Sequence, residues 1–353
     1  MAKSIRTAII AAAMTLLLAL GAAFTGLTAH AATSDQPTAT EPQVYKTVTV
    51  ADGITIKDNI TFHVEKADNA DGVTAPADVE AYDVEMTAAE LNANKNKSFG
   101  KSLNLAAKTT KVGEYTFKVT ENTPAAGWTN NSENKTYYVH VYVDKDGNHT
   151  YLITTQNTVT EGKLNGKVDK VEFTNTYVKT DGTFTVSKKV DKGDYTDKDT
   201  EYNFKATFTA SSTSGNVADF VKNIQLNGAA IPASQIASDG TVTFQLKDGE
   251  NANFTNVPVG VKVTVEETNR PSNVNSTSIT VTSNGKTSAL SGDNVKAENV
   301  LVGEGTNSVA YTNTYQDVTL TGVATKIAPF IAMVAIAGGA VALYIVSRRR
   351  RDA

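Results

Sequence analysis

The sequence contains no cysteine and has little histidine or tryptophan, with 4 His and 1 Trp in 353 residues. Without cysteine, disulfides cannot stabilise the fold, which matters for an exported protein. The histidines, His30, His63, His140 and His149, are too few and too scattered for a metal site. We therefore expect no metal and no other cofactor.

The chain also lacks an excess of either charge, since its formal net charge is -4 and its Lys and Asp residues are interspersed. A nucleic-acid partner is not expected from such a balance. No glycine-rich phosphate loop, nucleophile elbow or paired-acid pattern is present, and Asp144-Lys145-Asp146-Gly147 is typical of a turn. The sequence therefore does not indicate an enzyme that turns over a substrate.

Hydrophobic residues make up 40% of the chain, which is enough for real cores, and the length allows two domains with processing segments. Proline is scarce at 8 residues, whereas Thr, Val and Asn recur. Short alternating runs such as Thr241-Val242-Thr243-Phe244 are typical of strands. An all-β fold is predicted.

The N-terminus is typical of a secretory signal peptide. Lys3 and Arg6 precede an apolar run over residues 8–24, and Ala29-His30-Ala31 provides a small-x-small cleavage site. We predict a signal peptide over residues 1–31. The alternative is an N-terminal membrane anchor, for which the apolar run is short.

The C-terminus, residues 318–353, has the order of a sorting signal. Val318-Thr319-Leu320-Thr321-Gly322 precedes an uncharged stretch over 327–346, long enough to cross a bilayer, and a basic cluster at 348–351. This order resembles a sortase cell-wall sorting signal, although Val318 and Thr319 replace the usual Leu-Pro. The resemblance implies cleavage between Thr321 and Gly322, with Thr321 as acyl donor. The alternative is a plain tail-anchored membrane protein.

The region between the two ends contains a repeat. Val171–Tyr177 and Val309–Tyr315 are identical at five of seven positions. We predict two copies of one domain, at 44–178 and 179–317, joined by a short hinge at 178–182. Residues 32–43 are predicted to be an exposed leader after cleavage.

Each copy has enough predicted strands for a sandwich of two sheets. In the first copy, strands are predicted at 44–50, 60–64, 114–121, 136–143, 149–154 and 170–177. In the second copy, they are predicted at 183–190, 202–209, 241–246, 261–267, 276–282 and 308–315.

Polar residues share the inward phase of these strands, because alternate side chains on a strand point to the same face. Each copy has a Lys on its opening strand, a Glu ending a middle strand and an Asn on its closing strand. These residues are Lys46, Glu121 and Asn175 in the first copy and Lys188, Glu267 and Asn313 in the second. Burying them singly would cost several kcal/mol. A compensating reaction or network is therefore predicted.

The Phe-Thr-Asn-Thr-Tyr and Val-Thr-Glu elements resemble the streptococcal-type pilin isopeptide-linkage domains. That family has the collagen-adhesin B-type immunoglobulin-like sandwich fold, and its Lys and Asn side chains condense autocatalytically beside a Glu, which polarises the Asn carbonyl and shuttles protons. The resemblance implies isopeptide bonds from Lys46 to Asn175 and from Lys188 to Asn313, promoted by Glu121 and Glu267. Rival lysines in the first copy are Lys57 and Lys66. The alternative is that these are ordinary residues at strand ends.

The resemblance implies a structural subunit, most simply a backbone pilin, which sortase joins to neighbouring subunits and to peptidoglycan. The membrane would hold only the precursor, and the mature protein would lie on the cell surface. The family's acceptor lysine lies on the first domain, but its Tyr-Pro-Lys motif is missing here. Among Lys163, Lys167 and Lys170, we select Lys167 by position. The alternatives are a monomeric wall-anchored adhesin binding a host glycan or matrix protein, and a passive stalk.

Overall fold

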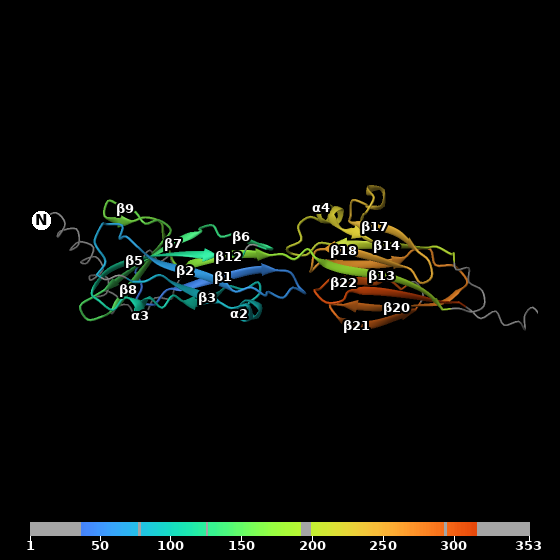
Figure 1. Ribbon diagram of the computed structural model, residues 1–353, viewed down its shortest axis with the longest axis horizontal. Helices are drawn as coiled ribbons and strands as arrows, with labels where there is room; N and C mark the ends of the chain where they lie inside the picture. The colour runs from blue at the N-terminus through green and yellow to red at the C-terminus, as the bar shows by residue number, and fades with distance from the viewer. Residues whose placement is uncertain (1–36, 77–78, 125, 192–198, 293–294, 316–353) are drawn as a thin grey trace, which may run out of the picture. The chain divides into compact units, whose positions relative to one another are not determined.

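The structure, a computed structural model, describes residues 37–76, 79–124, 126–191, 199–292 and 295–315. These residues form two compact units, and the main division between them falls between Thr180 and Asp181. Both units consist of β-sheets with a few short helices (Figure 1). The predicted all-β fold is confirmed.

The first unit has a four-stranded sheet, in the order β4-β1-β12-β6, and a six-stranded sheet, in the order β11-β8-β7-β5-β2-β3. Buried side chains of both sheets form one apolar core, so the unit is a β-sandwich. The strands are β1 (Gln43–Val50), β2 (Ile60–Ala67), β3 (Tyr82–Met86), β4 (Phe99–Ser102), β5 (Gly113–Asn122), β6 (Trp128–Asn130), β7 (Thr136–Val143), β8 (His149–Thr154), β11 (Lys167–Val168) and β12 (Val171–Tyr177). Smaller elements are helices α2 (Ala88–Ala93) and α3 (Leu105–Lys108) and the hairpin of β9 (Val159–Thr160) and β10 (Lys163–Leu164).

The second unit has a seven-stranded sheet, in the order β16-β15-β18-β13-β23-β20-β21, and a four-stranded sheet, in the order β17-β14-β19-β22. A second apolar core contains side chains of both sheets, so this unit is also a sandwich. The strands are β13 (Gly182–Asp191), β14 (Tyr202–Thr209), β15 (Gln225–Leu226), β16 (Ala229–Ala230), β17 (Thr241–Leu246), β18 (Asn251–Val257), β19 (Lys262–Glu267), β20 (Val274–Ser283), β21 (Lys286–Gly292), β22 (Ala297–Leu301) and β23 (Ser308–Tyr315). The helical elements are α4 (Val217–Phe220), η1 (Val221–Asn223) and η2 (Ala233–Gln235).

In both sandwiches the opening strand lies parallel to the closing strand. β1 pairs with β12, and Val48 is the register partner of Asn175. β13 pairs with β23, and Val190 is the register partner of Asn313. The lysine of each opening strand, Lys46 or Lys188, lies two residues before that partner. The repeat seen in the sequence therefore places Lys and Asn with the same offset on neighbouring strands.

The strands form here because β-branched and aromatic residues alternate with polar ones. β12 alternates between buried and partly exposed residues along its whole length, and so does β23. The same alternation directs Lys46 and Asn175 inward beside Val44, Val48 and Phe173. The inward phase predicted for the polar residues on these strands is confirmed.

Each predicted strand corresponds to an observed strand, but several observed strands were not predicted. The missed strands are mostly short or fully exposed. They include β3, β4 and β6 in the first sandwich and β18, β21 and β22 in the second.

The predicted leader, 32–43, is not wholly exposed, because its last residues pack on the first sandwich. Thr38 and Tyr151 form a bridge of two backbone hydrogen bonds, with N to O distances of 2.9 and 2.8 Å. Pro42 is buried, and β1 begins at Gln43. The backbone of this segment finds partners in β8, so residues 38–43 belong to the folded unit.

The predicted signal peptide, sortase motif, membrane span and basic tail lie outside the described residues, as do residues 32–36 of the leader. Among the residues that are described, no helix is long and apolar enough to span a membrane.

Candidate lysine–carboxylate–asparagine sites

The first sandwich holds a lysine and an asparagine on one buried carboxylate. Lys46 on β1 donates from Nζ to Glu121 Oε2 at 2.5 Å. Asn175 on β12 donates from Nδ2 to Glu121 Oε1 at 2.5 Å. Glu121 reaches them from β5 of the opposite sheet. The side chains of Lys46 and Glu121 are both 0% exposed, so the ion pair is shielded from water.

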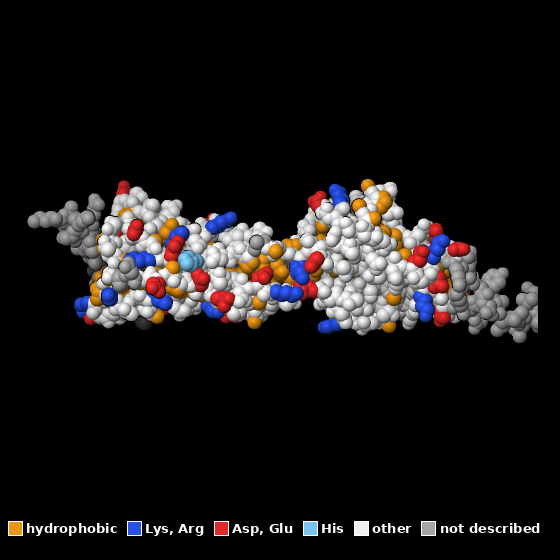
Figure 2. All heavy atoms as spheres, viewed as in Figure 1, with side chains coloured by type: hydrophobic (Ala, Val, Ile, Leu, Met, Phe, Trp, Pro, Cys, Tyr) orange, Lys and Arg blue, Asp and Glu red, His pale blue; other side chains and the backbone are white. Residues whose placement is uncertain are grey.

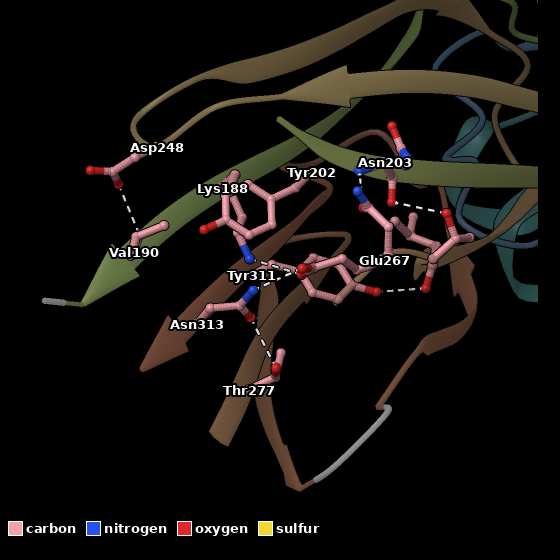
Figure 3. Close-up of polar contacts among 12 residues, drawn as sticks. Lys188, Val190, Tyr202, Asn203, Asp248, Glu267, Thr277, Tyr311 and Asn313 are labelled. Carbon is pink, nitrogen blue, oxygen red and sulfur yellow. Dashed lines mark hydrogen bonds and ion pairs between the residues drawn. The ribbon is translucent and has the colours of Figure 1, made fainter. Parts of the chain in front are cut away.

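The second sandwich repeats this arrangement (Figure 3). Lys188 on β13 donates from Nζ to Glu267 Oε2 at 2.8 Å, and Asn313 on β23 donates from Nδ2 to Glu267 Oε1 at 2.7 Å. Glu267 lies on β19 of the opposite sheet. In both sandwiches, therefore, one carboxylate binds the amine through one oxygen and the amide nitrogen through the other.

Burial changes the acid–base properties of both lysines. Desolvation lowers the pKa of Lys46 to about 8, although the charge of Glu121 and its hydrogen bond act in the opposite direction. Desolvation also lowers the pKa of Lys188, against the opposing effects of Glu267. A lowered pKa increases the fraction of neutral amine, which is the nucleophilic form of lysine.

Aromatic rings help to keep water away from both sites. Phe62 on β2 packs on Phe173 of β12, with ring centroids 5.3 Å apart. Phe204 on β14 packs edge-on against Tyr311 of β23, with ring centroids 5.2 Å apart. Phe62 and Phe204 are the register partners of the two carboxylates on the neighbouring strands. The second site has an additional ring, since Lys188 Nζ lies 4.2 Å from the centroid of Tyr202.

The two sites differ in the position of a hydroxyl group. In the first, Thr123 Oγ1 donates to Glu121 Oε1 at 2.6 Å. In the second, Thr277 Oγ1 donates to Asn313 Oδ1 at 2.9 Å. Sequence reasoning missed Thr123, Tyr202 and Thr277. Strand alternation could have found two of them, because Thr277 has the phase of the buried Ile279, and Tyr202 has the phase of the buried Phe204.

The amide orientation differs from the expected mechanism. The resemblance implies that the glutamate polarises the asparagine carbonyl, but in both sites the carboxylate accepts from the amide nitrogen. Asn313 Oδ1 instead contacts Thr277. Among the described residues, Asn175 Oδ1 is buried without a hydrogen-bond partner. The carboxylates are therefore placed to exchange protons with both nitrogens, and the carbonyl oxygens face elsewhere.

The other predicted residues lie outside these sites. The rival Lys57 is exposed and Lys66 is half-buried, whereas Lys46 is fully buried. Lys163 on β10 is exposed, Lys167 on β11 is half-buried and pairs with Thr154 of β8, and Lys170 forms an ion pair with Glu172 at 2.9 Å. Thr321 and Gly322 lie outside the described residues.

Across the described ranges, no group of three His, Cys, Asp or Glu residues could hold a metal ion. His140 is buried between Thr116 and Thr154, at 3.1 and 2.9 Å, and burial lowers its pKa to about 4. On the face shown in Figure 2, basic and acidic side chains are interspersed among uncharged ones.

Comparisons with known families separate the two sandwiches. Residues 42–178 match the profile described as "Spy0128-like isopeptide containing domain". Residues 182–315 match a different profile, described as a domain of unknown function (DUF7601). The two sandwiches therefore match different families, although the geometry of their sites is alike.

Among proteins of known name, the chain is 31% identical over 169 residues to a pilin of Streptococcus pyogenes serotype M1. This match covers 47% of the chain and about half of the pilin, 48%. The crystal structure of the major pilin from Streptococcus pyogenes is 21% identical, with a TM-score of 0.34 and coverage of 78% of this chain and 98% of that one. A pilus-presented adhesin is 16% identical, with a TM-score of 0.30 and coverage of 51% and 36%. Residues 42–178 thus match the Spy0128-like isopeptide containing domain, and 169 residues of the chain are similar to a pilin of Streptococcus pyogenes.

Proposed function

We propose that this protein is a structural pilus subunit whose two sandwiches are each closed by an intramolecular isopeptide bond. The observation that carries the proposal is the buried Lys–carboxylate–Asn arrangement, present in both sandwiches with the same strand offset. The bonds would join Lys46 to Asn175 and Lys188 to Asn313. Glu121 and Glu267 would promote them.

The chemistry is a single condensation in each sandwich. The neutral lysine amine attacks Cγ of the asparagine, the Cγ–Nδ2 bond breaks, and ammonia leaves. Holding amine and amide on one carboxylate provides an effective molarity that can lower the barrier by roughly 7 to 11 kcal/mol. An amide that is inert in water can then react once. No turnover follows, because the product is part of the fold.

A buried ion pair alone is a weak explanation for these residues. Replacing a buried ion pair by well-packed apolar residues often leaves a protein equally stable or makes it more stable, because desolvating two charges is costly. Crosslinking converts the Lys ammonium group into a neutral amide, so the mature protein would no longer bear the cost of burying that charge. This supports a reactive role over an ordinary structural one.

Assembly by sortase extends the proposal to the C-terminal segment. Thr321 would be transferred to a lysine of the neighbouring subunit, with Lys167 as our candidate acceptor, and the terminal subunit would be joined to peptidoglycan. The order of Thr321-Gly322, the uncharged stretch 327–346 and the basic residues 348–351 supports this role. The protein would then be a backbone pilin on the cell surface.

Cell-wall extracts of the native host test the assembly. We expect a ladder of covalent oligomers, which disappears in a sortase deletion and in Thr321→Ala. Lys167→Arg should also abolish the ladder, while Lys163→Arg and Lys170→Arg serve as matched controls from the same segment. A single wall-bound species in the wild type would instead favour a monomeric adhesin, the second candidate function.

A further inference from the structure

A buried threonine holds the carbonyl oxygen of the reacting amide in the second sandwich. Thr277 on β20 is 3% exposed and lies directly opposite Asn313 on β23. Its hydroxyl donates to Asn313 Oδ1 at 2.9 Å, and Figure 3 shows this contact on the side of the amide away from Glu267. The amide therefore has a separate partner for each of its two polar atoms.

The carboxylate cannot also serve the carbonyl in this arrangement. Glu267 Oε2 accepts from Lys188 and Oε1 accepts from the amide nitrogen, so both of its oxygens face nitrogen atoms. Attack on Cγ places a negative charge on Oδ1, and a donor already directed at that oxygen stabilises the charge. Thr277 is the group in contact with it.

Among the described residues of the first sandwich, no donor is in contact with Asn175 Oδ1. The residue opposite Asn175 on the neighbouring antiparallel strand, β6, is Asn130. Asn130 Nδ2 is directed at Thr123 Oγ1, at 3.4 Å, and within the described residues Asn175 Oδ1 has no partner. The two sites therefore share the proton-transfer groups but differ at the carbonyl.

We propose that Thr277 is a catalytic residue of the second site, donating its hydroxyl hydrogen to the oxyanion formed on Asn313 Oδ1. This inference rests on the proposed isopeptide chemistry. Lys188 Nζ first passes a proton to Glu267 Oε2 and then bonds to Cγ of Asn313, whose π electrons move to Oδ1. Nζ releases a second proton, and the Cγ–Nδ2 bond breaks as the oxyanion collapses. Of the two protons, one joins Nδ2, which leaves as ammonia, and the other remains on Glu267.

The size of the effect follows from other preorganised oxyanion donors, whose removal slows a reaction on the order of 10²- to 10³-fold. Thr277→Val keeps the shape and removes the hydroxyl, so bond formation at the second site should slow by that factor. Thr277→Ser keeps the hydroxyl and should stay near the wild-type rate. Thr280→Val is a matched control, because Thr280 is an exposed residue of the same strand.

The experiment uses the whole chain, pulse-labelled with heavy lysine and sampled over time. Proteolysis and mass spectrometry detect the crosslinked peptides containing Lys188 and Asn313, and those containing Lys46 and Asn175. The crosslink between Lys46 and Asn175 is an internal control in each molecule, because Thr277 is in the other sandwich. Only molecules in which residues 182–315 resist limited proteolysis are counted, so that misfolded variants do not enter the rate.

The expected result is slow formation of the Lys188–Asn313 bond in Thr277→Val. In the same molecules the Lys46–Asn175 bond should form at the wild-type rate. In Thr277→Ser and Thr280→Val the Lys188–Asn313 bond should form at or near the wild-type rate. A wild-type rate in Thr277→Val would overturn the inference. So would a loss of rate in Thr277→Ser equal to that in Thr277→Val, since packing and not the hydroxyl would then be responsible. Absence of both crosslinks in the wild type would instead overturn the proposed function.

Discussion

At the scale of single residues, the notable feature is a fully buried lysine in each sandwich. An ammonium group removed from water needs a charged partner and further hydrogen bonds, or it loses its proton. Lys46 has only Glu121 as a charged partner within hydrogen-bonding distance among the described residues, and its pKa is lowered to about 8 despite that partner. The folded state therefore disfavours the protonated amine and increases the fraction of the neutral amine, which is the nucleophile of the proposed reaction.

This shift predicts how pH affects the uncrosslinked first sandwich. In Asn175→Ala, which cannot form the bond, the unfolded chain retains the Lys46 proton between pH 8 and 10.5 while the folded chain has lost it. The unfolded state then binds more protons, so the unfolding free energy should rise with pH across this window, by up to about 3 kcal/mol.

Trp128 provides the measurement, because it is the only Trp in the sequence and is buried in the first sandwich. Urea unfolding followed by its fluorescence at pH 8 and pH 10 gives the two free energies. The control adds Lys46→Met and Glu121→Gln to Asn175→Ala, which removes both charges. An equal rise with pH in the control would show that Lys46 is not responsible.

At the scale of elements, the proposed bonds join the first strand of each sandwich to its last. In the first sandwich the bond closes a loop of roughly 130 residues, and the chain-entropy relation for crosslinks gives a stabilisation of about 5 kcal/mol. Asn175→Ala should lower the unfolding free energy of the first sandwich by this order. The matched control is Asn130→Ala, because Asn130 lies on β6 opposite Asn175. This substitution should lower the unfolding free energy much less. Similar losses in the two variants would contradict a covalent link.

Strand alternation explains how much of these elements the sequence predicts. The predicted bounds of β7 and β8 coincide with the observed ones; β7 mostly alternates between buried and partly exposed residues, whereas the last four residues of β8 are all buried. β21 could not be predicted in this way, because all seven of its residues are exposed and no apolar face marks it. β6 has only three residues, which are held by pairing with β12 rather than by their own pattern. Its position depends on contacts distant in sequence.

The same limit applies to the sites. The alternation of side chains along each strand predicts that the lysines, glutamates and asparagines face inward. The structure brings each set of three into contact. Strand alternation does not determine which amide atom faces the carboxylate. It also does not distinguish Thr123, which contacts the acid, from Thr277, which contacts the amide. Those differences depend on side-chain rotation and on the neighbouring strand.

At the scale of the whole molecule, the parallel pairing of β1 with β12 determines how the first sandwich would bear force. Tension that enters at Gln43 and leaves at Tyr177 would pass through the Lys46–Asn175 bond and bypass the residues between them. The wild-type sandwich should therefore not extend when pulled from its ends. Glu121→Ala should release a loop of roughly 130 residues, a step on the order of 400 Å. Single-molecule pulling measures this, and an equal step in the wild type would contradict the proposal.

The most direct test of the central claim is the intact mass of residues 32–317, made without the sorting signal. The account predicts a mass lower than the calculated one by two molecules of ammonia. Glu121→Ala should restore one of them, Glu267→Ala the other, and the double variant both. An unshifted wild-type mass would contradict the account and leave an ordinary pair of sandwiches with buried ion pairs.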